Sequence, residues 1–103
     1  MFVTLATLLP AVSAAGPGYP VACPQELPGK SVGIQVSGTF VGTVILEGTI
    51  ATQAEVNGAT AAWTAITGAS WTVPALASLT LAYTHIRANV TAYTSGSITV
   101  RAI

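Results

Sequence analysis

The sequence predicts an all-β fold: a single antiparallel β-sandwich, jelly-roll-like, that follows an extended Pro-rich N-terminal arm. From Ser31 onward polar and apolar residues alternate, and Thr, Val and Ile dominate, as in short strands with one buried face. Turn residues recur at roughly ten-residue intervals, and five of the six prolines precede residue 30. We expect an arm over residues 1–30 and a sandwich domain over residues 31–103, with a small barrel as the alternative.

The arm is predicted from its prolines, which cannot donate to a strand ladder and favour extended backbone. Residues 1–16 end in small residues, like a secretory signal peptide, but Pro10 interrupts the apolar run and no Lys or Arg precedes it. The alternative for these residues is an ordered apolar arm or a first strand. Cys23 is the only cysteine, so neither an internal disulfide nor a multi-thiolate zinc site is possible. We expect it to be a small buried hydrophobe.

Two hairpins are predicted in the sandwich. Residues 31–37 and 43–50 pair around the turn at residues 38–42, which places Val32, Ile34, Val36, Val44, Leu46 and Ile50 on the buried face. Residues 84–93 and 97–103 pair around a three-residue loop, which places Val90 opposite Val100 and Ala92 opposite Ile98. No helical periodicity is seen.

Between the hairpins the sequence predicts shorter elements. Asn57-Gly58 is expected to form a turn, and residues 61–66 a strand that carries Trp63. Residues 71–73 are expected to form a short strand ended by Pro74. Residues 79–83 either begin the long C-terminal strand or precede a bend before it.

The chain has very little charge. Hydrophobic residues make up 51% and charged residues 6%, and the formal net charge is zero, a composition that favours association over dispersion. We expect no nucleic-acid partner, because the chain has only three basic residues to neutralise phosphates, namely Lys30, Arg87 and Arg101. Residues 56–85 lack charge but are interrupted by Gly, Pro, Thr and Ser, so no membrane span is expected.

The inventory of catalytic residues is small, and we expect no enzyme, no cofactor and no metal site. His85 is the only histidine and no Asp is present, so a serine triad lacks its parts. We expect His85 to be a strand or interface residue. Glu47 and Glu55 are the only carboxyl pair close in sequence, and we expect Glu47 on the solvated face rather than in a glycosidase site.

Among the aromatic residues, Trp63 and Trp71 are more often core residues in so apolar a domain. The alternative is an exposed platform that binds carbohydrate. Phe40, at the tip of a turn, is the aromatic that we expect to be least buried in its own monomer.

Three blocks of the sequence resemble a small β-sandwich found repeatedly in tailed-phage virion proteins. They are Gly38–Gly48 (GTFVGTVILEG), then Trp63 and Ile66, then His85–Val100 (HIRANVTAYTSGSITV). The resemblance covers residues 31–103, except that many relatives carry Asp-Gly where this chain has Asn57-Gly58. It implies an accessory role in the virion, as capsid decoration (cement), head-fibre or tail component, commonly as a trimer and without a cofactor.

We therefore expect a decoration protein whose sandwich packs on a phage head while its arm contacts the major capsid protein or another neighbour. The predicted partner-binding residues are Phe2, Leu5, Leu8, Leu9, Tyr19 and Phe40. In the alternative for the arm, it folds back on its own sandwich. The alternative function is a tail or head-fibre module that binds a receptor or carbohydrate, and a secreted enzyme that uses His85 is a distant third.

Overall fold

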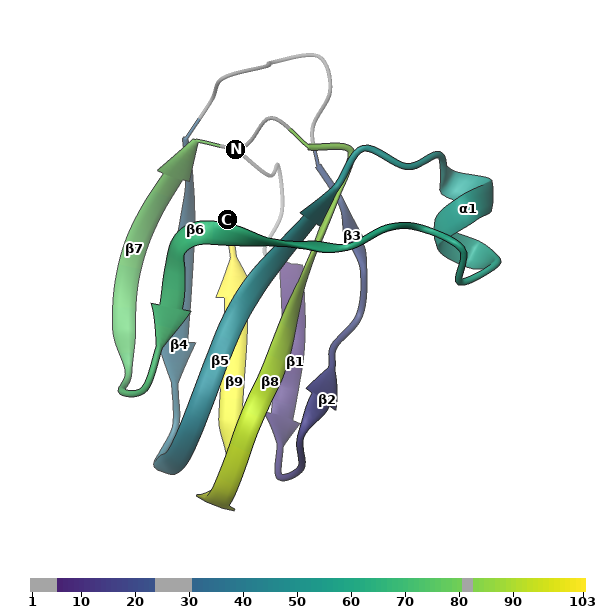
Figure 1. Cartoon of the computed structure of the whole chain (residues 1–103). Coiled ribbons are helices and arrows are strands. Elements are labelled where there is room, and N and C mark those ends of the chain that lie inside the picture. The colour runs from purple at the N-terminus through teal and green to yellow at the C-terminus, as the bar shows by residue number, and fades with distance from the viewer. Residues whose placement is uncertain (1–5, 24–30, 81–82) are drawn as a thin grey trace.

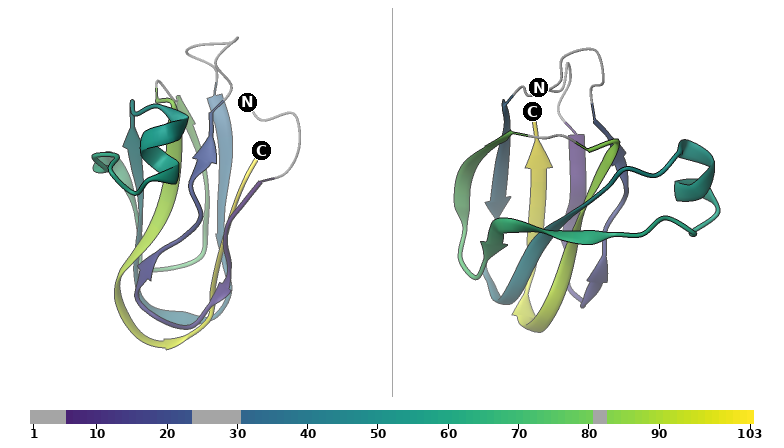
Figure 2. Two further views of the ribbon diagram at one scale, coloured as in Figure 1. Left: turned by 90° about the vertical axis from the view of Figure 1, so that its right-hand side faces the viewer. Right: turned by 45° about the horizontal axis from the view of Figure 1, so that its top comes forward.

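The computed structural model describes residues 6–23, 31–80 and 83–103, which form two antiparallel β-sheets packed face to face (Figures 1 and 2). The described elements are β1 (Ala6–Val12), β2 (Gly16–Pro17), β3 (Val21–Ala22), β4 (Ser31–Ser37), β5 (Phe40–Thr49), α1 (Gln53–Asn57), β6 (Thr64–Trp71), β7 (Ala75–Thr80), β8 (His85–Gly96) and β9 (Ile98–Ala102). The first sheet has the order β1-β9-β4-β7. The second has the order β2-β8-β5-β6, and β3 also pairs with β8. The prediction of an all-β antiparallel sandwich is confirmed at this level.

The core lies between the sheets and is built from alternate residues of each strand. Burial of each large side chain contributes roughly 1.5–3 kcal/mol. On the two strands after the arm, the predicted buried residues Val36 and Val44 are at most 1% exposed. Ile50 is the exception at 81% exposed, because it lies beyond the end of β5. The largest fully buried side chains are Leu8, Leu9, Val32, Ile34, Val36, Val44, Leu46, Ile86, Val90, Ile98 and Val100.

Neither predicted hairpin forms. β4 pairs with β7 and β9, whereas β5 pairs with β6 and β8, so the chain crosses from one sheet to the other between β4 and β5. The same is true of β8 and β9, which belong to different sheets. Residues that were expected to lie in one sheet instead lie in opposite sheets, and their side chains meet across the core. Alternation of polar and apolar residues specifies which side of a strand is buried. It is compatible both with two strands paired in one sheet and with two strands in opposite sheets.

The two crossings lie beside each other at the lower end of the molecule in Figure 1. The amide N–H of Ser97 donates to the carbonyl oxygen of Thr39 at 2.9 Å and so joins them. Gly38 and Gly96 have φ of 107° and 93°, a left-handed region that favours glycine. A side chain at Gly96 would also lie 2.6 Å from the Cα of Phe40. Both glycines are therefore needed for the close approach of the two crossings.

The part of the predicted arm that the structure describes, residues 6–23, is integrated into the sandwich. β1 pairs with β9 at the edge of the first sheet, and β2 and β3 pair with successive parts of β8 at the edge of the second. Leu8 and Leu9 are 0% and 1% exposed. Prolines are compatible with this because edge strands leave one side of the backbone unpaired. For these residues the fold-back alternative describes the arrangement, and residues 1–5 and 24–30 lie outside the described residues.

The middle of the chain departs from the prediction in three ways. Asn57 ends a short helix, α1, rather than forming a hairpin turn. Thr52 and Glu55 form a capping box at its start, because Thr52 Oγ1 accepts from the Glu55 amide and Glu55 Oε1 accepts from the Thr52 amide. β6 spans Thr64–Trp71, so Trp63 precedes it and Trp71 ends it. Residues 72–73 form a bend rather than part of a short strand, and β7 begins directly after Pro74. A bend precedes β8, which agrees with one of the two alternatives for residues 79–83.

Candidate interaction surface

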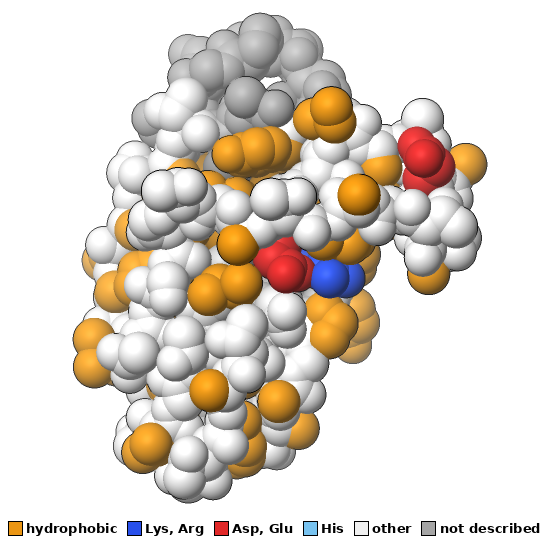
Figure 3. All heavy atoms as spheres, in the orientation of Figure 1, with side chains coloured by type: hydrophobic (Ala, Val, Ile, Leu, Met, Phe, Trp, Pro, Cys, Tyr) orange, Lys and Arg blue, Asp and Glu red, His pale blue; other side chains and the backbone are white. Residues whose placement is uncertain are grey.

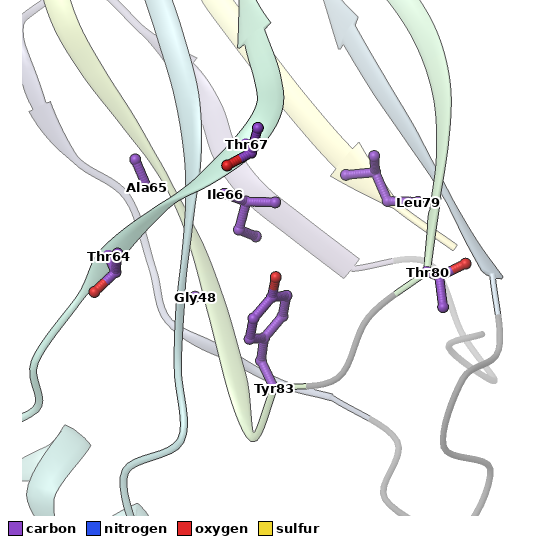
Figure 4. A pocket seen from close by; sticks show the side chains of 8 residues that line it. All are labelled: Gly48, Thr64, Ala65, Ile66, Thr67, Leu79, Thr80 and Tyr83. Atoms are coloured by element: carbon purple, nitrogen blue, oxygen red, sulfur yellow. The ribbon is translucent and has the colours of Figure 1, made fainter.

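One flank of the sandwich carries the edge strands of both sheets, β6 and β7, and we call it the β6–β7 side (Figure 1). A pocket of about 360 Å³ opens there between the two sheets. Large apolar side chains are exposed on or next to this flank, with Val73 62% and Leu76 78% exposed. The pocket is lined by Gly48, Thr64, Ala65, Ile66, Thr67, Leu79, Thr80 and Tyr83 (Figure 4).

Tyr83 is the central side chain of this pocket. Its ring packs on Gly48, where an added Cβ would lie 2.9 Å from the ring Cγ, so the ring position requires glycine. Figure 4 shows the ring pointing into the space between Ile66 and Leu79. A second depression on the same flank shares Gly48, Thr64 and Tyr83 and adds the exposed side chain of Ile50. Among the described residues, none that lines either depression is charged. The chemistry of the two depressions is therefore apolar, with threonine and tyrosine hydroxyls.

The outer face of the second sheet carries an ion pair at its centre. Arg87 Nε donates to Glu47 Oε1 at 2.7 Å, and Asn89 Nδ2 donates to Glu47 Oε2 at 3.4 Å. The guanidinium carbon of Arg87 lies 4.6 Å from the ring centroid of Trp63, a cation–π contact. Figure 3 shows one acidic and one basic group side by side on this face, with apolar and uncharged atoms around them. Glu47 faces outward as expected, but it is paired with Arg87.

His85 is 6% exposed and joins α1 to the start of β8. Its Nε2 lies within hydrogen-bond distance of Gln53 Oε1, at 2.9 Å. Its Nδ1 lies 3.1 Å from Thr84 Oγ1, which also lies 2.7 Å from the carbonyl oxygen of Ala51. The neighbours of the imidazole are thus an amide and a hydroxyl that hold the loop after β5. Among the described residues, no carboxylate is bonded to the ring.

The predicted partner-binding residues have different environments. Leu8 and Leu9 lie in the chain's own core, and Phe40 is half-buried and packs against that core. Tyr19 is 64% exposed and remains available at the surface. Phe2 and Leu5 lie outside the described residues. The exposed residues Val73 and Leu76 are not among the predicted partner-binding residues, because the sequence predicts a strand over residues 71–73 and no element over residues 75–78.

Cys23 packs in the core at 6% exposure, and burial raises the pKa of its thiol from 9.0 to about 11. This agrees with the expectation of a small buried hydrophobe. Among the described residues, no three His, Cys, Asp or Glu side chains are close enough to hold a metal ion together. No helix in the described part of the chain is long and apolar enough to span a membrane.

Comparison of the chain with protein-family models, with curated proteins and with solved structures gives no match. The resemblance to the β-sandwiches of phage virion proteins therefore remains an expectation that rests on the three sequence blocks.

Proposed function

We propose that this chain is a non-enzymatic structural subunit of a virion, a capsid decoration (cement) protein that stabilises a phage head by packing on its shell. The observation that carries the proposal is the combination of 6% charged residues with two edge strands, β6 and β7, that carry no charge and lie beside the exposed side chains of Val73 and Leu76. A surface with so little charge gains by covering its apolar groups with other protein. The partners are the major capsid protein or another virion protein, and further copies of the chain.

The order of the strands supports a virion role at the level of architecture. If β2 and β3 count as one interrupted strand, each sheet has four strands, in the orders first-eighth-third-sixth and second-seventh-fourth-fifth. We interpret this order as a jelly roll, an architecture used by viral capsid and lectin domains. Because one fold serves many functions, the architecture adds to the argument from the surface and does not replace it.

Among the described residues, the side chains that could have supported catalysis are engaged in structural contacts. Glu47 is paired with Arg87, and Glu55 caps α1 through its contact with the Thr52 amide. His85 is bonded to Gln53 and Thr84 rather than to an acid. These contacts favour a structural protein over a hydrolase. Loss of a hydrolase activity on His85→Ala would contradict the proposal.

The copy number per purified particle tests the proposal and locates the protein. Quantitative mass spectrometry of particles is expected to find hundreds of copies, as shell decoration requires. Purified chain should also bind back to particles that lack it and raise the temperature at which the heads rupture. A protein absent from particles, or a chain that stays monomeric at high concentration and binds no virion component, would overturn the proposal.

A tail or head-fibre module that binds a receptor or carbohydrate is the second candidate, and the pocket at Tyr83 favours it. Its aromatic ring and threonine hydroxyls are groups that can contact a sugar. A dozen or fewer copies per particle, together with a change of tryptophan fluorescence on glycan titration that Tyr83→Ala abolishes, would favour this candidate over shell decoration.

A further inference from the structure

The outer edge of β7 pairs with no other strand among the described residues, and it lacks the features that protect sheet edges from pairing with other chains. Such protection comes from prolines, bulges or charges on the edge strand. β1 contains Pro10 and two register shifts, β2 contains Pro17, and β6 has a register shift and a left-handed Gly68 with φ of 83°. β7 pairs with β4 through six consecutive residue pairs without a shift, and its sequence, ALASLT, has no charge. Of the edges in the described sheets, β7 is thus the one most open to pairing.

The backbone groups at this edge can be identified from the neighbouring ladder. Gly33 and Ile103 exchange two backbone hydrogen bonds, of 2.8 and 2.9 Å, so the polar groups of Gly33 point toward β9. Because polar groups alternate in direction along a strand, those of Ser31 and Gln35 also point toward β9. The residues opposite these three on β7 are Ser78, Thr80 and Leu76. Their N–H and C=O groups therefore point away from β4, toward the free edge, and their side chains are exposed.

We propose that β7 pairs with β7 of a second copy of this chain, antiparallel and centred on Ser78. In an antiparallel ladder, two opposed residues whose groups point at each other exchange both hydrogen bonds. The register that places Ser78 opposite its own copy also places Leu76 opposite Thr80, so all three outward residues of each copy are paired at once. Any other register leaves at least one of them unpaired. The pairing obeys two-fold symmetry, as an isologous dimer requires.

The side chains of β7 suit a second copy. Leu76 is 78% exposed, and in this register it would lie beside Thr80 of the partner on the continuous outer face of the joined sheets. With no charge on the strand, juxtaposition of two copies brings no like charges together. The first sheets of the two copies would form one eight-stranded sheet. The inference rests on the proposed function in one respect, namely that copies of the chain associate with each other. It predicts a two-fold contact, whereas the resemblance implies a trimer.

A cysteine at the proposed symmetry axis gives the most direct test. Opposed residues in such a pair have Cα atoms about 5.5 Å apart, a separation that a disulfide can bridge. Under mild oxidation Ser78→Cys is expected to form a disulfide-linked dimer at least about tenfold faster than Thr91→Cys, an exposed control on β8. The native Cys23 should not compete, because it is buried and its pKa is raised to about 11.

Two further substitutions measure the association itself by analytical ultracentrifugation. Ser78→Pro removes an outward N–H, and Ser78→Lys places two like charges across the axis. Each should raise the dimer dissociation constant at least about tenfold, which corresponds to about 1.4 kcal/mol, while Thr91→Lys should not. Ser78→Lys keeps the test valid should Ser78→Pro fail to fold. The inference is overturned if Ser78→Cys is linked no faster than the control, or if a folded Ser78→Lys chain associates unchanged. A trimer that is insensitive to Ser78 would overturn this contact and leave the proposed function intact.

Discussion

At the scale of single residues, Arg87 organises the outer face of the second sheet. It forms an ion pair with Glu47 and a cation–π contact with Trp63, although the three residues come from different segments of the chain. Both members of the ion pair are largely buried, with side-chain exposures of 22% for Arg87 and 13% for Glu47. Removal of one partner from such a pair leaves the other charge with poor solvation.

Arg87→Ala is accordingly expected to lower the free energy of unfolding by about 1.5–3 kcal/mol, the range for hydrogen bonds to charged groups. Arg87→Lys should recover only part of this loss, because an ammonium group does not present the planar face that stacks on Trp63. Urea denaturation followed by tryptophan fluorescence measures both. Arg101→Ala, at an exposed position, is the control and should change stability by no more than about 0.5 kcal/mol. Equal stability of the two alanine variants would refute the assigned role of Arg87.

Cys23 is expected to make the free energy of unfolding decrease at alkaline pH. Burial raises its pKa from 9.0 to about 11 in the folded chain, so the folded state favours the protonated thiol. The stabilisation that this provides is fully present below pH 9 and is lost as the pH rises from 9 to 11. Denaturation at several pH values should therefore show a steeper loss of stability over that interval in the wild type than in Cys23→Ala. Identical slopes in the two proteins would contradict the buried position of the thiol.

At the scale of the elements, the sequence predicted which faces of strands are buried but not which strands are neighbours. Val36 and Val44 are both buried as predicted, yet they belong to opposite sheets. The decisive information lies in Gly38 and Gly96, whose left-handed backbone turns the chain across the sandwich rather than back along the same sheet. Sequence shows glycine but not the sign of φ. The exposed position of Leu76 could not be predicted for a related reason, because ALASLT alternates weakly and does not show which of its two leucines faces the core.

Gly96→Ala and Gly68→Ala distinguish two causes of destabilisation, steric crowding by the added Cβ and strain of the left-handed backbone. Both glycines have positive φ, 93° and 83°, so alanine introduces strain of about 1–2 kcal/mol at either position. At Gly68 no atom lies within 4 Å of the added Cβ, whereas at Gly96 it meets the backbone of Thr39 and Phe40. Gly96→Ala is therefore expected to be the more destabilising by at least about 1 kcal/mol, as measured by thermal denaturation. A Gly68→Ala variant as unstable as Gly96→Ala would show that the crossings are not packed this closely.

At the scale of the whole molecule, the N-terminal segment completes both sheets. β1 extends the first sheet, and β2 and β3 extend the second, so residues 6–23 cover the edges of β9 and β8. The opposite flank, with β6 and β7, has no such cover within the described residues. One end of each sheet is thus closed by proline-containing strands from the same chain. The proposed partner molecule would cover the other end.

Two Leu→Ala substitutions of the same size distinguish these flanks. Leu9 of β1 is 1% exposed. Leu9→Ala should therefore lower the free energy of unfolding by about 2–5 kcal/mol, because it removes buried apolar surface and leaves a cavity. Leu76 is 78% exposed on the β7 flank, so Leu76→Ala should change the stability of the monomer by no more than about 0.5 kcal/mol. It should nevertheless weaken self-association, because its side chain would lose contact with the partner copy. Denaturation at low concentration and ultracentrifugation over a concentration series measure the two effects separately. If Leu9→Ala leaves the stability unchanged, the N-terminal segment does not pack on its own sandwich, and the molecule has two open flanks instead of one.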